Sequence, residues 1–213
     1  MSGRLIAWLS FVGILVALAY ATRATAGKPD RDVVYSYGFA VAGLVQYGIV
    51  LGVVLLIARG RPELLALRRP PSWPAALGVS IALLIGTFVF LAIVEAYLQP
   101  GEEQGLTPSG WDPDRAVPFA VNFAVIAGVA PLIEELTFRG LGYSLLEPLG
   151  RWAAIAIVGL AFGLVHGLVE GLPVLVVFGA ALAYLRARTA SVYPPFALHA
   201  AFNAIALVVS VAT

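Results

Sequence analysis

Apolar runs of membrane-spanning length recur along this 213-residue chain, and they constrain its fold more than any other feature. A helix needs about 20 apolar residues to cross the roughly 30 Å of hydrocarbon in a bilayer. The sequence predicts spans at residues 5–22, 35–58, 75–98, 118–138, 152–169, 172–187 and 194–211. The runs are continuous and do not alternate at period two, which favours helices over a barrel. We therefore predict an all-α, polytopic transmembrane helix bundle of about seven to eight spans.

The composition excludes a soluble domain of this length. Charged residues make up only 12% of the chain, whereas a typical soluble domain has about a quarter. The net charge of +1 gives no indication of nucleic-acid binding, so we expect the lipid bilayer and no nucleic acid among the partners. The absence of cysteine excludes disulfides, thiol catalysis and cysteine-based zinc sites.

The distribution of arginine predicts the orientation in the membrane. The loop at 59–74 is rich in arginine, whereas the loop at 99–117 is mainly acidic. Because arginine marks the cytoplasmic side of short loops, we expect the first loop inside and the second outside. The N-terminus is then cytoplasmic. The arginines that fall on the same side are Arg4, Arg139, Arg151, Arg186 and Arg188.

The first apolar run also imitates a secretory signal peptide, because Arg4 precedes it and Ala24–Ala26 resembles a cleavage site. The run is longer than most signal-peptide cores, so we favour an uncleaved anchor. We expect a single membrane domain over 1–213. Its N-terminal part, 1–115, holds ordinary membrane helices and loops, whereas 117–211 places polar residues inside the spans.

The stretch APLIEELTFRG, residues 130–140, puts two glutamates and an arginine in apolar surroundings. Glu135 and Arg139 are four residues apart, on one helical face, which predicts a structural ion pair. Glu134 has no such partner and points elsewhere on the helix, so it needs a partner from another helix or from water. Pro131 is expected to bend the helix just before the glutamates.

Two histidines, His166 and His199, lie in predicted spans, and Asn203 follows His199 by one helical turn. Either histidine alone is typical of helix-to-helix hydrogen bonding. With Glu134 they suit hydrolysis, in which a carboxylate activates water, a histidine shares the proton and an amide donates to the oxyanion. Glu134, His166 and His199 also suit a metal such as zinc. The residues alone leave both possibilities open.

The ordered motifs EELTFR, FGLVH and HAAFN resemble those of the CPBP family, which comprises type II CAAX proteases and bacteriocin-processing or self-immunity proteins, also called the ABI family. The resemblance covers about residues 118–211. It implies an intramembrane glutamate-type endopeptidase in which Glu134 activates water, assisted by His166. His199 and Asn203 would then form the oxyanion hole, and Glu135 and Arg139 would hold the site in shape.

The family pattern also implies a metal-free mechanism, so we expect no cofactor, with zinc as the alternative. We expect a peptide or membrane-protein substrate and a bacterial plasma membrane. Since bacteria generally lack protein prenylation, we expect a substrate other than a prenylated protein. The oligomeric state is left open. Two other functions use the same residues: a non-catalytic scaffold or self-immunity protein, and a proton-coupled transporter.

Overall fold

The computed structural model describes residues 2–25, 27, 30–98, 103, 106, 108 and 110–212, and the regular elements in these ranges are all helical. The α-helices are α1 (Gly3–Thr25), α2 (Tyr37–Ala58), α3 (Trp73–Glu95), α5 (Ala116–Ala124), α6 (Ala130–Glu135), α7 (Tyr143–Leu146), α8 (Arg151–Leu164), α9 (Leu172–Thr189) and α10 (Tyr193–Ala212). The π-helical segments are η4 (Val125–Val129) and η5 (Leu136–Gly142). The 3₁₀ turns are η1 (Val33–Tyr35), η2 (Pro62–Leu65), η3 (Pro113–Arg115) and η6 (Glu147–Leu149). The all-α prediction is confirmed.

Six described helices are long and apolar enough to span a membrane, fewer than the sequence predicts. The span predicted at 152–169 is wrong, because α8 has 14 residues and a length of about 21 Å. It ends early where the chain turns towards Gly167, whose φ is +67°. The span predicted at 118–138 is too short, because helical structure runs unbroken over Pro113–Leu149. It stops at Gly150, whose φ of +105° suits only glycine.

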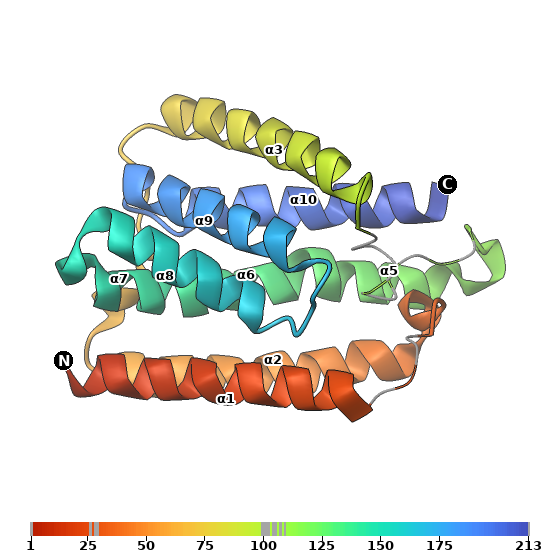
Figure 1. Cartoon of the computed structure of the whole chain (residues 1–213), viewed down its shortest axis with the longest axis horizontal. Helices are drawn as coiled ribbons and strands as arrows, with labels where there is room; N and C mark the ends of the chain where they lie inside the picture. The colour runs from red at the N-terminus through yellow and green to blue at the C-terminus, as the bar shows by residue number, and fades with distance from the viewer. Residues whose placement is uncertain are drawn as a thin grey trace.

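The long helical segment lies in the middle of the bundle (Figure 1). Helices α1 and α2 lie side by side on one flank, and α3 lies on the other, against α9 and α10. Within the segment, α6 contacts both α2 and α10. This arrangement places Glu134 and Glu135 between two helices that are remote from them in sequence.

Helix α1 is attached to this central segment through Trp8. The Trp8 side chain is fully buried and its Nε1 donates a hydrogen bond to the Thr137 carbonyl at 3.0 Å. A Cβ on Gly142 would lie 2.4 Å from the Trp8 ring, so only glycine admits the indole here. Gly142 thus allows α1 to pack closely against the central segment.

The outer faces of the bundle are apolar over the length of the helices. Large exposed side chains include Ile14, Leu56, Ile85 and Val209. Exposed aromatic residues lie at helix ends or beside them, among them Trp73, Tyr97 and Trp152, as is typical of residues at the membrane–water interface. Such a surface is stable only in lipid, and the protein is an integral membrane protein.

Candidate active site

The polar residues of α6 lie between two π-helical segments, η4 and η5. In η4 the Ala130 N–H bonds to the Val125 carbonyl. The donor in the same register for the Ile126 carbonyl would be Pro131, whose nitrogen carries no hydrogen. Asn203 Nδ2 of α10 donates to that carbonyl instead, at 2.9 Å. Pro131 thus frees a backbone group that joins α10 to the central segment, a local irregularity of the kind often found at functional sites.

Glu135 is the centre of a buried charge network. Its Oε1 accepts from Arg139 Nη1 at 2.9 Å and lies 2.9 Å from His199 Nδ1. The side chains of Glu135 and Arg139 are fully buried. The ion pair expected from their i, i+4 spacing is present. Sequence reasoning did not find the contact with His199, which joins α6 to α10.

Arg139 links this network to two further helices. Its Nη2 donates to the Gly179 carbonyl of α9 at 2.8 Å, and its guanidinium carbon lies 4.3 Å from the centre of the Phe162 ring of α8. Because a buried guanidinium needs both partners and packing, these contacts account for its place in the interior. Arg186, assigned from the sequence to the cytoplasmic arginines, is also buried and donates from Nε to the Arg139 carbonyl at 3.1 Å.

Glu134 faces the other side of α6 and is 14% exposed. Its Oε1 accepts a hydrogen bond of 2.6 Å from the Tyr47 hydroxyl of α2. Its Oε2 lies 3.7 Å from His199 Nε2, too far for a direct hydrogen bond. The expected partner from another helix is therefore found twice, in α2 and in α10. Tyr47 was missed, although a tyrosine in the middle of an apolar span is itself a signal.

His199 lies between the two glutamates, and its contacts determine which ring nitrogen carries a hydrogen. The carboxylate of Glu135 is paired with Arg139 and can only accept, so His199 Nδ1 carries a hydrogen. In the neutral ring Nε2 is then a lone-pair acceptor, and it becomes a donor only when the ring is doubly protonated. At 3.7 Å from Glu134 Oε2, this nitrogen is beyond direct hydrogen-bond reach, and a water molecule beside the pair could contact both atoms.

His166 bonds to the backbone of its own helix. Its Nδ1 lies 2.7 Å from the Phe162 carbonyl, so Nδ1 carries the hydrogen and Nε2 the lone pair. The Phe162 ring lies 4.8 Å from the His166 ring and 5.6 Å from the His199 ring, between centroids. Among the described residues, the hydrogen-bond and ion-pair partners of Glu134 are Tyr47 and His199. His166 is not one of them.

The alternative metal site does not fit these positions. In the described part of the chain, no three His, Asp or Glu side chains are placed to hold a metal ion. Glu134 and His199 are neighbours, whereas His166 is bonded to a backbone carbonyl.

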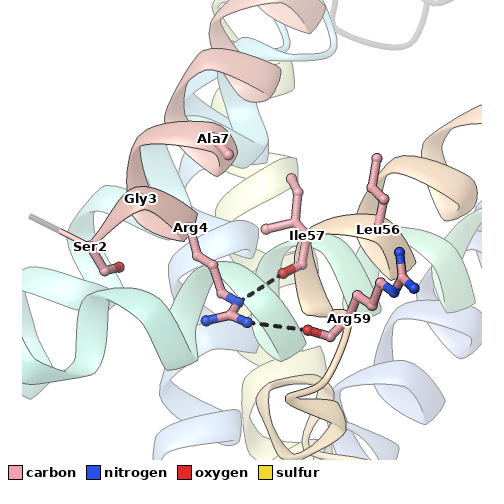
Figure 2. A pocket seen from close by; sticks show the side chains of 7 residues that line it. All are labelled: Ser2, Gly3, Arg4, Ala7, Leu56, Ile57 and Arg59. Carbon is pink, nitrogen blue, oxygen red and sulfur yellow. Dashed lines mark hydrogen bonds between the residues drawn. The ribbon is translucent and has the colours of Figure 1, made fainter.

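Two cavities lie away from Glu134. One of about 550 Å³ opens at the start of α1, where Arg4 donates to the carbonyls of Ile57 and Arg59 at the end of α2 (Figure 2). The other, about 180 Å³, is an apolar groove between α3 and α10 that includes Leu198 and Ala201. Neither is lined by Glu134. The groove borders the helix that carries His199.

Comparison with known proteins agrees with the motifs. Residues 116–205 match the model of the family described as Type II CAAX prenyl endopeptidase Rce1-like. The resemblance to the CPBP family is confirmed. The chain is also 28% identical over 206 residues to the Bacillus subtilis (strain 168) protein named "Putative membrane peptidase YdiL", an alignment that covers 92% of this chain and 81% of that protein. No solved structure matches the chain significantly.

The region matched to this CPBP-type model contains all the residues singled out by the motifs, from Glu134 to Asn203. Tyr47 lies outside it, on a helix that precedes the match by more than a full span. The direct neighbours of the motif glutamate therefore come from both parts of the chain.

Proposed function

We propose that this protein is an intramembrane endopeptidase that hydrolyses a peptide bond with a water held beside Glu134. The observation that supports this best is the 3.7 Å separation between Glu134 Oε2 and His199 Nε2, because a water beside the pair would contact a base and a second polar group together. The family match and the relative's name agree with a peptidase.

In the proposed reaction Glu134 is the general base. Its carboxylate takes a proton from the water as the water oxygen bonds to the scissile carbonyl carbon. The carbonyl oxygen becomes an oxyanion, and the carbon is tetrahedral. Collapse of this intermediate breaks the carbon–nitrogen bond, and the proton held by Glu134 passes to the leaving amine. Glu134 ends the cycle as it began, ionised.

His199 and Asn203 are the proposed oxyanion donors. Asn203 uses one N–H on the Ile126 carbonyl, which leaves its second N–H for the substrate. His199 can donate from Nε2 only as the doubly protonated ring. As that ring, His199 would bond to Glu135 through Nδ1 and present its Nε2–H to the oxyanion. Arg139 in turn holds Glu135 in place.

The proposed role of His166 is to share the proton with Glu134 through a water. Its Nδ1–H is occupied by the Phe162 carbonyl, which fixes the ring and leaves the Nε2 lone pair for that task. His166→Ala is expected to lower kcat and to leave the melting temperature close to native. Unchanged kcat would remove His166 from the mechanism.

We propose a peptide segment that enters from the bilayer or its cytoplasmic face as substrate, in a bacterial plasma membrane with the N-terminus inside. A non-catalytic scaffold is the second candidate, and one observation favours it: Glu134 is mostly buried, with one oxygen held by Tyr47. A scaffold needs no water at Oε2, whereas an endopeptidase does.

Comparison of peptide amino termini separates the two candidates. Membranes from cells that express the native protein are compared by mass spectrometry with membranes that contain Glu134→Gln at the same level. An endopeptidase produces new amino termini only with the native chain, and those termini identify the substrate. Identical termini in the two samples, from equal amounts of folded protein, would favour the scaffold.

A further inference from the structure

Tyr47 lies near the middle of α2, far from both ends of its span. Tyrosine is enriched at membrane interfaces, where its hydroxyl meets water. Deep in a span the same hydroxyl needs a partner within the protein. The partner here is Glu134 Oε1, at 2.6 Å. This distance is within the range of a hydrogen bond from a hydroxyl to a carboxylate, which is among the stronger kinds.

The two oxygens of Glu134 are thereby given different surroundings. Tyr47 of α2 binds Oε1, and His199 of α10 faces Oε2 across 3.7 Å. A carboxylate on a long side chain rotates freely unless something fixes it, and a base must be held within a few tenths of an ångström of its working position. The hydrogen bond to Oε1 fixes the plane and directs Oε2 towards the gap beside His199.

We propose that Tyr47 is the positioning residue of the catalytic base, an inference that rests on the proposed hydrolytic function. The hydroxyl does not touch the water or the substrate. It acts through Glu134, by occupying Oε1 so that Oε2 alone receives the proton from water. The N-terminal part of the chain, which the family match does not reach, thus completes the active site.

Tyr47→Phe tests this with little change of shape. We expect kcat to fall by about 10- to 100-fold, since the base keeps its chemistry but loses its orientation. The KM and the melting temperature are expected to stay close to native values. Tyr35→Phe is the matched control, because its hydroxyl donates at 2.7 Å to the Gly110 carbonyl, away from the site. That control is expected to retain native kcat.

The same variants in a Glu134→Gln background separate this inference from the proposed function. If Glu134 is the base, Tyr47→Phe has no further effect on the residual activity of Glu134→Gln. Native activity in Glu134→Gln would overturn the hydrolytic mechanism itself. Loss of activity in Glu134→Gln with native kcat in Tyr47→Phe would overturn only the role of Tyr47. A Tyr47→Phe protein that no longer folds would also overturn it, by assigning the hydroxyl to stability.

Discussion

The N-terminal helices and the region from residue 113 onward lie in the same bilayer but differ in where they bury polar side chains. In the most apolar 18-residue stretches of α1, α2 and α3, 11–17% of the residues are buried, against 33% in Pro113–Leu149, 50% in α9 and 22% in α10. Among the described residues, every buried polar or charged side chain except Thr87 lies in the later region. The first region mainly presents apolar side chains to lipid, and the second holds the buried charged side chains, which are unfavourable in lipid.

Tyr47 is an exception, because it lies in the first region and its hydroxyl donates a hydrogen bond to Glu134 in the second. Trp8 is a second exception, because its indole N–H donates a hydrogen bond to the Thr137 carbonyl. The comparison of the two regions therefore teaches that a family match confined to one of them does not include every residue that contacts Glu134. The predictions below test how sharp the division is.

The largest effect on stability is expected from Arg139→Ala. It leaves the Glu135 carboxylate buried without its cation, and breaking such a pair costs about 3–5 kcal/mol of unfolding free energy. Thermal unfolding in detergent measures this loss of stability. The control is Arg188→Ala, which removes an exposed arginine from the neighbouring helix α9. Native melting with lost activity would instead assign Arg139 directly to catalysis.

Asn203→Ala is expected to lower kcat by about 10²–10³-fold, the usual effect of losing one oxyanion donor. Asn122 provides the comparison, since its buried amide donates to the carbonyls of Val34 and Ser36 and fastens the chain away from the site. Asn122→Ala is expected to lower the melting temperature and leave kcat per folded molecule unchanged. If Asn203→Ala also lowers only the melting temperature, the role of Asn203 is structural and limited to its hydrogen bond with the Ile126 carbonyl.

A smaller, pH-dependent effect is expected at Glu103. It accepts from the N–H groups of Val169 and Gly171, at 2.8 and 2.9 Å, and pairs with Arg23. Burial by itself raises the pKa of Glu103, but these N–H groups and Arg23 together hold that pKa below its usual value. A lowered folded pKa stabilises the protein above the unfolded pKa, and this contribution is lost as the pH falls through the folded pKa.

Melting curves against pH measure this contribution. Glu103→Gln is expected to lower the melting temperature by about 2–4 °C at neutral pH. The difference from native is expected to shrink below about pH 4, as the native carboxyl becomes protonated. A difference that does not change with pH would show that the charge of Glu103 has no part in it.

The smallest effect is expected from chelation. The proposed mechanism needs no metal, so exhaustive treatment with a chelator is expected to leave turnover unchanged. Activity that is lost on chelation and restored by zinc would replace the glutamate-centred mechanism with a metal-centred one.

Much of this molecule follows from local patterns in the sequence. The all-helical fold follows from the apolar runs, and the Glu135–Arg139 pair from a spacing of four residues. Contacts between distant helices do not follow, because no periodicity records which residues meet across a bundle. The bonds from Glu135 to His199 and from Glu134 to Tyr47 span 64 and 87 residues.

The local sequence pattern also did not predict the length of the central helix. Arg139 followed by Gly140 and Gly142 is typical of a helix end, yet π-helical turns carry the helix to Leu149. Glu134 consequently lies near the middle of this segment, whereas a span ending at 138 would place it near the membrane surface. Here the packing of Trp8 and Arg186 against η5 overrides the local signal.

The central claim is that Glu134 is the base, and turnover by Glu134→Gln tests it most directly. Native protein, Glu134→Gln and the control Glu95→Gln, which changes an exposed glutamate at the end of α3, are placed in liposomes with one identified peptide substrate. We predict native cleavage by Glu95→Gln and only residual cleavage by Glu134→Gln, with all three proteins folded and binding the peptide equally. Cleavage by Glu134→Gln at the native rate would contradict the account.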